Sequence, residues 1–217
     1  IGLSRMDTKT GICTNYINDP NDSLSIGKGH INSIAQDKND NIWIGTDVDV
    51  YALDTKTGKF QRYIMGSGQI TNLCVDETGK IWTAGVGGLY FFDKEKNSFK
   101  KFTTQAFPDG FENVWGIVED DKGNLWLSTS ENIIKINKER NAVKIFNATQ
   151  GVQPMTGIWL KNFRSKDGRL FLGGSKGYYS FKPDELIDDK TESIFYFTNF
   201  KIGSEEIVAG EGSVLTA

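Results

Sequence analysis

Histidine and cysteine are nearly absent from this 217-residue chain, which contains one His and two Cys. A Cys/His zinc site needs about four such ligands, so the composition excludes that common structural metal site. A single histidine also gives little basis for a catalytic triad. We therefore predict no catalytic residue, no metal ion and no cofactor in this part of the molecule.

The sequence also lacks long runs of one charge and long apolar runs. Its 25 basic and 28 acidic residues are interspersed and give a net charge of -3. A nucleic-acid interface would need a concentrated basic patch, so we predict no contact with DNA or RNA. No stretch approaches the roughly 18 apolar residues of a membrane span. The first residues also lack the apolar region of a secretory signal.

The residues that are abundant indicate β-structure. Glycine occurs 24 times and aromatic residues make up 12% of the chain. Isoleucine outnumbers alanine by 21 to 8. Branched and aromatic residues favour strands, and frequent glycine is typical of tight turns. This composition predicts an all-β fold and argues against a helical bundle.

A sequence repeat of about 40 residues is the strongest signal in the chain. Three segments, DKNDNIWIGT, DETGKIWTAG and DDKGNLWLST, each place a Trp six residues after an Asp. The three pairs are Asp37 and Trp43, Asp76 and Trp82, and Asp120 and Trp126. A fourth copy, SKDGRLFLGG, has Ser165 and Phe171 at these positions. The aromatic positions are separated by 39, 44 and 45 residues.

Each repeat contains short apolar runs separated by Gly, Asn and Asp, which is the local pattern of an antiparallel meander. Four strands with a period of about 40 to 45 residues are typical of a β-propeller blade. We therefore predict that residues 1–190 form the C-terminal part of a β-propeller with about four and a half repeats. The repeat units are 1–16, 31–63, 70–102, 114–146 and 158–186.

Most of the repeated residues have structural roles in this prediction. Each Trp is expected to be buried between adjacent blades, and each Asp to accept hydrogen bonds in a hairpin turn. Cys13 and Cys74 fall at different strand positions in different blades, too far apart for a disulfide. We predict two free thiols.

The connections between repeats differ in length, whereas the turns after the first and third strands of each repeat do not. The connections 17–30, 64–69, 103–113 and 147–157 contain 14, 6, 11 and 11 residues. In an antiparallel meander they lie at the same end as the turns between second and third strands. We call this end the variable face and the opposite end the constant face. Variable loops on a rigid scaffold commonly carry recognition, so we predict ligand binding at the variable face.

Aromatic rings and hydrogen-bonding groups together suit the flat C–H faces and hydroxyls of a sugar. The variable face offers this mixture, with rings expected to be exposed at Phe111, Trp115 and Trp159. The full set of predicted ligand-binding residues is His30, Asp49, Phe111, Trp115, Glu131 and Trp159.

The repeat, with its I-x-x-D-x-x-G-N-L-W-L-S-T pattern and D-K-E-K-N type of turn, resembles the two-component regulator propeller repeat. The resemblance covers residues 1 to about 186. Residues 194–202, IFYFTNFKI, resemble the first strand of the triple-tyrosine immunoglobulin-like domain that follows the propeller in that family. The resemblance assigns residues 191–217 to the start of this Ig-like β-sandwich.

This resemblance implies the periplasmic sensor region of a Bacteroidetes-type hybrid two-component system. Such sensors carry seven-bladed propellers, detect oligosaccharides and signal through a membrane span to a histidine kinase that controls transcription of polysaccharide-use genes. The implied partners are an oligosaccharide, the remaining blades and Ig-like domain of a longer chain, and a second copy in a homodimer. The membrane contact would come only through that longer chain.

Two other functions fit a propeller with variable loops. It could be an enzyme, either a lyase or a glycosidase, and His30 with nearby acids is the feature that favours this alternative. It could also be a scaffold for protein interactions. Because a propeller without ring closure has free sheet edges, we further expect residues 1–217 alone to behave poorly in solution.

Overall fold

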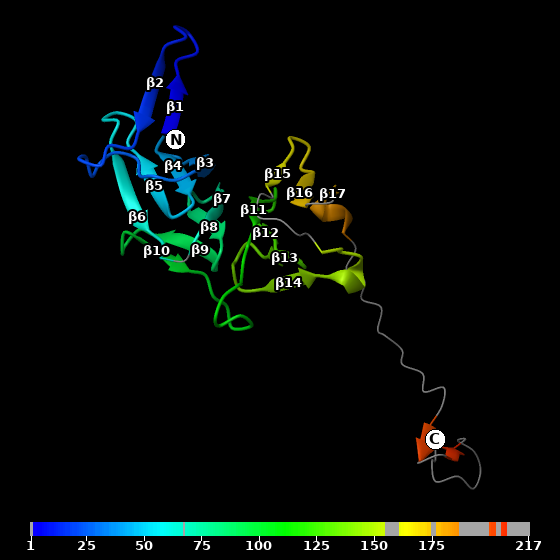
Figure 1. Cartoon of the computed structure of the whole chain (residues 1–217). Helices are drawn as coiled ribbons and strands as arrows, with labels where there is room; N and C mark the ends of the chain where they lie inside the picture. The colour runs from blue at the N-terminus through cyan, green and yellow to red at the C-terminus, as the bar shows by residue number, and fades with distance from the viewer. Residues whose placement is uncertain are drawn as a thin grey trace. The chain divides into compact units, whose positions relative to one another are not determined.

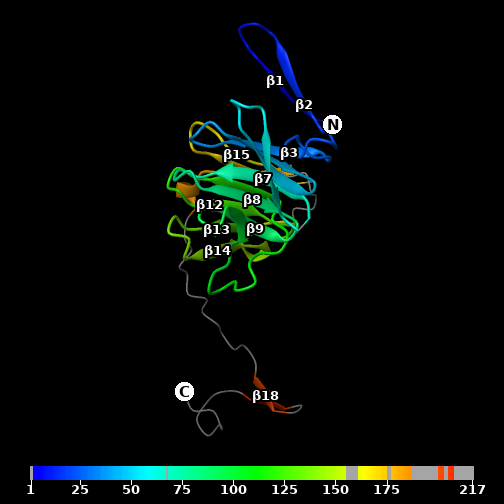
Figure 2. The ribbon, with the colours of Figure 1, turned by 90° about the vertical axis from the view of Figure 1, so that its left-hand side faces the viewer.

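The computed structural model describes residues 2–66, 68–154, 161–174 and 177–186, and two short strands at 200–202 and 205–207. The chain divides into two compact units, residues 1–186 and 187–217. The first unit is built from antiparallel sheets whose inner strands are neighbours, as expected for propeller blades (Figures 1 and 2). The predicted all-β propeller fold is confirmed.

Three complete four-stranded blades form the centre of this unit, and each follows the chain order from its inner to its outer strand. The first contains β3 (Ile31–Gln36), β4 (Ile42–Thr46), β5 (Asp49–Leu53) and β6 (Phe60–Ile64). The second contains β7 (Ile70–Val75), β8 (Ile81–Gly85), β9 (Gly88–Asp93) and β10 (Ser98–Lys101). The third contains β11 (Gly116–Glu119), β12 (Leu125–Ser128), β13 (Ile133–Ile136) and β14 (Val143–Phe146).

Incomplete sheets lie before and after these blades in the sequence. A hairpin of β1 (Gly2–Met6) and β2 (Cys13–Ile17) precedes them. The last sheet contains β15 (Asn162–Arg164), β16 (Leu170–Gly174) and β17 (Gly177–Phe181). Two 3-10 turns, η1 (Ala148–Gln150) and η2 (Pro183–Glu185), follow β14 and β17. No helix among the described residues is long and apolar enough to cross a membrane.

Strand pairing confirms the register of the sequence repeat. The repeated aromatic residue faces the same inner-strand position each time, in the pairs Ala35–Trp43, Cys74–Trp82, Val118–Trp126 and Phe163–Phe171. The hairpin β1–β2 has the register of the third and fourth strands of a blade, because Met6 pairs with Cys13 as Leu53 pairs with Phe60. Residues 2–17 therefore correspond to the two outer strands of a blade.

The three Trp side chains are buried between blades, and each donates a hydrogen bond to its own Asp. Their exposed fractions are 5% for Trp43, 1% for Trp82 and 1% for Trp126. The indole Nε1 atoms lie 2.9, 2.8 and 2.8 Å from the Oδ2 atoms of Asp37, Asp76 and Asp120. The same carboxylates accept main-chain N–H groups of the following turn. One Asp thus fixes both a turn and the ring of a core Trp.

Burial of the Asp37 and Asp76 carboxyls would raise their pKa, but the hydrogen bonds outweigh this effect. Donors that include the indole and the turn N–H groups hold both pKa values below the usual 3.8. The fifth repeat unit, residues 158–186, lacks both partners, since Ser165 and Phe171 replace the Asp and the Trp. The two positions therefore change together within this one chain.

Inner strands are joined by hydrogen bonds between blades. The Leu73 N–H donates to Ser33 Oγ and the Ile117 N–H donates to Asn72 Oδ1, both at 2.9 Å. At the next interface, Gly116 leaves room for the side chain of Asn162, which would lie 2.5 Å from a Cβ atom there. Successive blades are therefore held by polar contacts near the axis as well as by the buried rings.

Both cysteines are free, as predicted. Cys13 is exposed on β2, whereas burial, together with the nearby Glu119 and Asp76 carboxylates, raises the pKa of the Cys74 thiol to about 12. The second unit contains the antiparallel pair β18 (Phe200–Ile202) and β19 (Glu205–Ile207). Most of residues 191–217 lie outside the described residues, and their assignment to an Ig-like β-sandwich stays a prediction.

We predict that the Asp–Trp pair behaves as one energetic unit. Trp126→Phe and Asp120→Ser should each lower the free energy of unfolding by about 1 to 3 kcal/mol, because each leaves a buried polar partner without its hydrogen bond. The double variant, which has the residues of the fifth repeat, should lose about 1 kcal/mol less than the sum. Denaturant unfolding of the four proteins measures this coupling.

The matched control combines Asp120→Ser with Trp43→Phe, two residues that lie in different blades. Their effects should add within about 0.5 kcal/mol. Equal additivity in the two pairs would contradict the coupling between Asp120 and Trp126.

Candidate functional site on the variable face

A polar cluster around Asp47 occupies the variable face beside the inner strands. Asp47 lies in the turn between β4 and β5, and its Oδ2 accepts from the His30 main-chain N–H (3.0 Å) and His30 Nδ1 (2.8 Å). Its Oδ1 accepts from Asn32 Nδ2 and Gln69 Nε2, both at 3.0 Å. Donors from two inter-blade connections (His30 and Gln69) and from β3 (Asn32) thus converge on a single carboxylate.

This arrangement sets the charge and the role of Asp47. Burial raises its pKa, but hydrogen bonds from Asn32, His30 and Gln69 outweigh that effect and lower it to about 2. Both carboxylate oxygens are already occupied by donors from the protein. Asp47 therefore orients the surrounding side chains, while the His30 side chain, 70% exposed, presents its ring to solvent.

Lys161 brings a positive charge from the fifth repeat to the same region. Its Nζ donates to the main-chain carbonyl of Asn32 at 2.8 Å and also to that of Thr71. Within the described part of the chain, no carboxylate forms an ion pair with Lys161. Partial burial lowers the pKa of its ammonium group. The lysine links repeats that are far apart in the sequence, across the inner ends of their blades.

A second feature of this face is a pocket of about 430 Å³ between the connection 103–113 and the β12–β13 turn. Its walls combine an aromatic ring, carboxylates, amides and aliphatic side chains: Phe107, Phe111, Glu112, Asn113, Ser130, Glu131, Asn132, Ile134 and Ile145. Phe107 is only half-buried, and its ring centroid lies 4.8 Å from that of Phe111. The pocket can offer an apolar wall and hydrogen-bonding groups to one small polar ligand.

The structure leaves two of the predicted ligand-binding residues accessible. His30 is exposed in the Asp47 cluster, and Glu131 is exposed in the wall of the pocket. Trp159 lies outside the described residues.

The expected exposure of Phe111 and Trp115 is wrong. Phe111 is 4% exposed and packs in the core with Phe102 and Trp82, although it also lines the pocket. Trp115 is 8% exposed, packs with Trp126 between the third blade and the last sheet, and donates its indole N–H to Ser130 Oγ. Adjacent sheets cover both rings, and Trp115 supports the pocket wall from behind.

The expected accessibility of Asp49 is also wrong. It is the first residue of β5 and is 1% exposed. Its Oδ2 forms an ion pair with Arg62 (2.6 Å), and its Oδ1 accepts the main-chain N–H of Met65 (3.1 Å). Asp49 therefore fixes the end of β6 and leaves no free oxygen for a ligand.

Several residues of the site were not predicted from the sequence. Asn32, Asp47, Gln69 and Lys161 have no common motif, and their convergence depends on the closeness of different repeats at the axis. The pocket residues Glu112 and Asn132 could have been found, because both follow from the rule that places inter-blade connections beside second-to-third strand turns. The described residues contain no cluster of three or more His, Cys, Asp or Glu suited to a metal ion.

Comparison with known families identifies the repeats. The model of the family described as two component regulator propeller matches residues 25–48 and 110–131. These segments include the first and third Asp–Trp pairs. These two segments therefore match the two-component regulator propeller repeat, and for them the resemblance inferred from the sequence is confirmed.

Solved structures with the same fold include extracellular domains assigned to two-component systems. The chain is similar to the extracellular domain of a hybrid two-component system from B. thetaiotaomicron, with 22% identity and a TM-score of 0.66. The match covers 84% of this chain and 24% of that chain. The extracellular domain of a second such system from that organism gives 18% identity, a TM-score of 0.64, and coverage of 82% and 24%.

A propeller enzyme shares the fold at a lower score. Virginiamycin B lyase from Staphylococcus aureus has 17% identity and a TM-score of 0.52, covering 73% of this chain and 57% of that chain. No curated protein matches the chain. The chain spans about a quarter of the length of these two extracellular domains, and the similarity at these identities establishes the propeller fold.

We predict that Asp47→Asn removes a stabilisation that the wild type has near neutral pH and loses in acid. A carboxyl with a pKa of about 2 in the folded protein and 3.8 in the unfolded chain stabilises the fold above pH 3.8. That contribution, about 2 kcal/mol, is lost as the pH falls towards 2. Urea unfolding at several pH values should show wild type and variant converging between pH 4 and pH 2. A constant difference down to pH 2 would contradict this assignment.

Proposed function

We propose that the chain is the ligand-sensing part of the extracytoplasmic domain of a hybrid two-component system. The observation that carries this proposal is the two-component regulator propeller repeat itself, with its match at residues 25–48 and 110–131. The fold similarity to extracellular domains of such systems supports it. In this proposal the domain is periplasmic, and remaining blades, an Ig-like domain and a second copy of the protein complete the sensor. Ligand binding then controls transcription through a kinase across the membrane.

We further propose an oligosaccharide as the ligand of the variable face. The pocket beside Glu131 supplies carboxylate and amide groups next to the half-buried Phe107 ring. The Asp47 cluster supplies a fixed His30 ring, and Lys161 adds an ammonium group nearby. Sugar hydroxyls bind such charged and amide groups, and sugar C–H faces pack on aromatic rings. A chain of several sugar units suits a surface with two separate polar features.

Binding of neutral gluco-, xylo-, manno- and galacto-hexaoses to the complete domain tests this proposal. Glu131→Gln should weaken binding of the recognised hexaose about tenfold, because a charged hydrogen bond contributes about 1.5 to 3 kcal/mol. The melting temperature should stay unchanged, since Glu131 is exposed and its side chain forms no described ion pair. Calorimetric titration and thermal melting give the two readouts.

Glu95→Gln is the matched control, because Glu95 is an exposed residue of a constant-face turn. It should leave binding unchanged. Equal affinities of the Glu131 and Glu95 variants, or no binding of any hexaose, would contradict an oligosaccharide site beside Glu131.

An enzyme is the second candidate, and one observation favours it. The His30 Nδ1 atom lies 2.8 Å from an Asp47 oxygen while the ring is exposed, which is the geometry of a general base oriented by a carboxylate. The fold similarity to virginiamycin B lyase agrees with such a role. Consumption of a bound oligosaccharide by the wild type, abolished in His30→Ala, would replace the sensor proposal with this one.

A further inference from the structure

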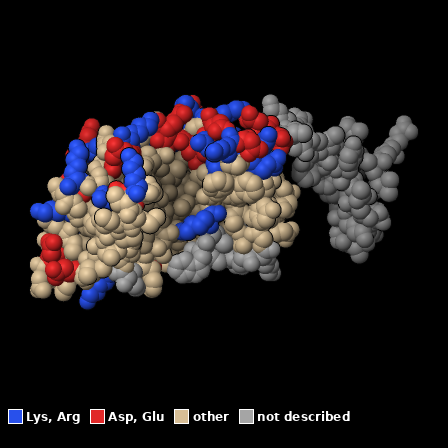
Figure 3. All heavy atoms as spheres, turned by 90° about the horizontal axis from the view of Figure 1, so that it is seen from above, with Lys and Arg blue, Asp and Glu red and all other residues tan. Residues whose placement is uncertain are grey.

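Charged side chains of both signs gather along one edge of the first unit (Figure 3). Three lysines, Lys38, Lys59 and Lys94, line a groove of about 830 Å³ between the first two complete blades. Rings from both blades form its floor, with Trp43 and Tyr63 on one side and Phe92 on the other. Most of its other lining residues belong to constant-face turns, so the groove lies away from the variable face.

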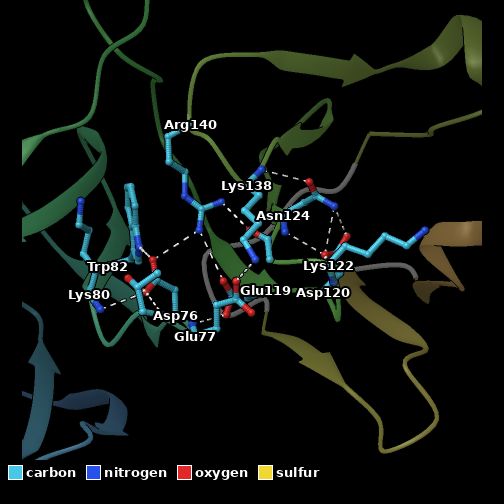
Figure 4. Close-up of polar contacts among 12 residues, drawn as sticks. Asp76, Glu77, Lys80, Trp82, Glu119, Asp120, Lys122, Asn124, Lys138 and Arg140 are labelled. Carbon is cyan, nitrogen blue, oxygen red and sulfur yellow. Dashed lines mark hydrogen bonds and ion pairs between the residues drawn. The ribbon is translucent and has the colours of Figure 1, made fainter.

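The corresponding interface between the second and third complete blades is closed by opposite charges. Glu77 lies over Gly123 of the third blade and forms an ion pair with Lys138 (Figure 4). Glu77 directly follows the repeated Asp76, and Lys138 directly follows β13 and Asn137. The turns of these two blades therefore attract each other.

Arg140 fills the remainder of that second interface. Its guanidinium lies 5.4 Å from the Trp82 ring centroid and donates to the carbonyl of Gly123 at 2.8 Å. It also lies 3.4 Å from an Asp76 oxygen and 3.5 Å from a Glu119 oxygen (Figure 4). A residue from the turn after the third strand thus covers the core Trp of the preceding blade.

The first interface lacks these ion pairs because other residues stand at the equivalent positions, and Lys38 bridges it by donating to the main-chain carbonyl of Glu77. Lys38 is the equivalent of Glu77 and Lys94 the equivalent of Lys138, so two cations line this groove where the next interface has an ion pair. Lys96 replaces Arg140 and is exposed, and Val75 replaces Glu119. Among the described residues, no carboxylate forms an ion pair with these lysines. The gap over Trp43 therefore stays open.

The two carboxylates that line the groove, Asp37 and Asp54, form no described ion pair with its lysines, and hydrogen bonds within their own turns hold them in place. Asp37 accepts from the Trp43 indole and from the Asn39 and Asn41 main-chain N–H groups. Asp54 accepts from the Lys56 N–H and the Thr57 hydroxyl of its own turn. Among the described residues, the groove therefore keeps lysines without an ion-pair partner above an aromatic floor, and Lys38 donates only to the main-chain carbonyl of Glu77.

We propose that this groove binds an acidic oligosaccharide, with uronic acid carboxylates on Lys38 and Lys94 and sugar faces against the rings of Tyr63 and Phe92. Charge complementarity selects an anion, and half-buried ring surfaces suit flat C–H faces. The walls are faces of paired strands, so the main-chain pairing by which an extended peptide binds at a sheet edge is absent from the floor. Because both walls lie within this chain, the site needs no other blade.

Trigalacturonic acid and neutral maltotriose, titrated into the complete domain, test the groove. The acid trisaccharide should bind and the neutral one should not. Lys94→Glu should weaken binding at least tenfold, because it places a carboxylate opposite Lys38 and recreates the ion pair of the next interface. Lys38→Gln should also weaken binding, and raising the salt concentration should weaken it further.

Lys100→Glu is the matched control, since Lys100 is exposed on β10 of the same blade and does not line the groove. It makes the same charge change and should leave binding intact. No binding of trigalacturonic acid, equal losses in the Lys94 and Lys100 variants, or equally tight binding of a hexaglutamate peptide would overturn the proposal. Hexaose binding that depends on Glu131 is measured separately. The result for the variable-face pocket therefore does not decide the proposal for the groove.

Discussion

The hydrogen bond from the repeated Trp to the Asp six residues earlier is the interaction on which the blade structure depends. It orients a buried ring against the next blade and, through the same carboxylate, closes the turn between the first two strands. An indole N–H buried without a partner would be costly, as would a buried carboxylate. Two polar groups that would each destabilise the core therefore define its geometry together. The fifth repeat has neither group: Ser165 and Phe171 stand at these positions, so no buried polar group is left without a partner there.

Because the Asp–Trp contacts involve only the constant-face turns, the inter-blade connections can vary in length. The constant-face turns carry the Asp residues that hold the rings, so their lengths are fixed by the core. The inter-blade connections carry no such constraint and differ from 6 to 14 residues. Polar residues from separate repeats consequently meet at the variable face, as Asp47, Gln69 and Lys161 do. A rigid repeat with unequal connections is a suitable scaffold for recognising one ligand among many.

The sequence predicted the blades well, because their signal is local: Trp43, Trp82 and Trp126 recur with the same turn and strand pattern. It predicted the site less well. Whether a ring near a loop is exposed depends on the adjacent blade, and Trp115 and Phe111 proved to be covered by neighbouring side chains. Asp49 was likewise misjudged, because its ion pair with Arg62 forms across a strand pair.

Hydrogen–deuterium exchange of the complete domain, with and without the hexaose it binds, tests the central claim most directly. The account predicts that the ligand slows exchange at the connection 103–113 and the β12–β13 turn, while the constant-face turns that begin at Asp37, Asp76 and Asp120 exchange as before. Protection confined to those constant-face turns, with the variable-face loops unchanged, would contradict the division between a fixed scaffold and recognition loops.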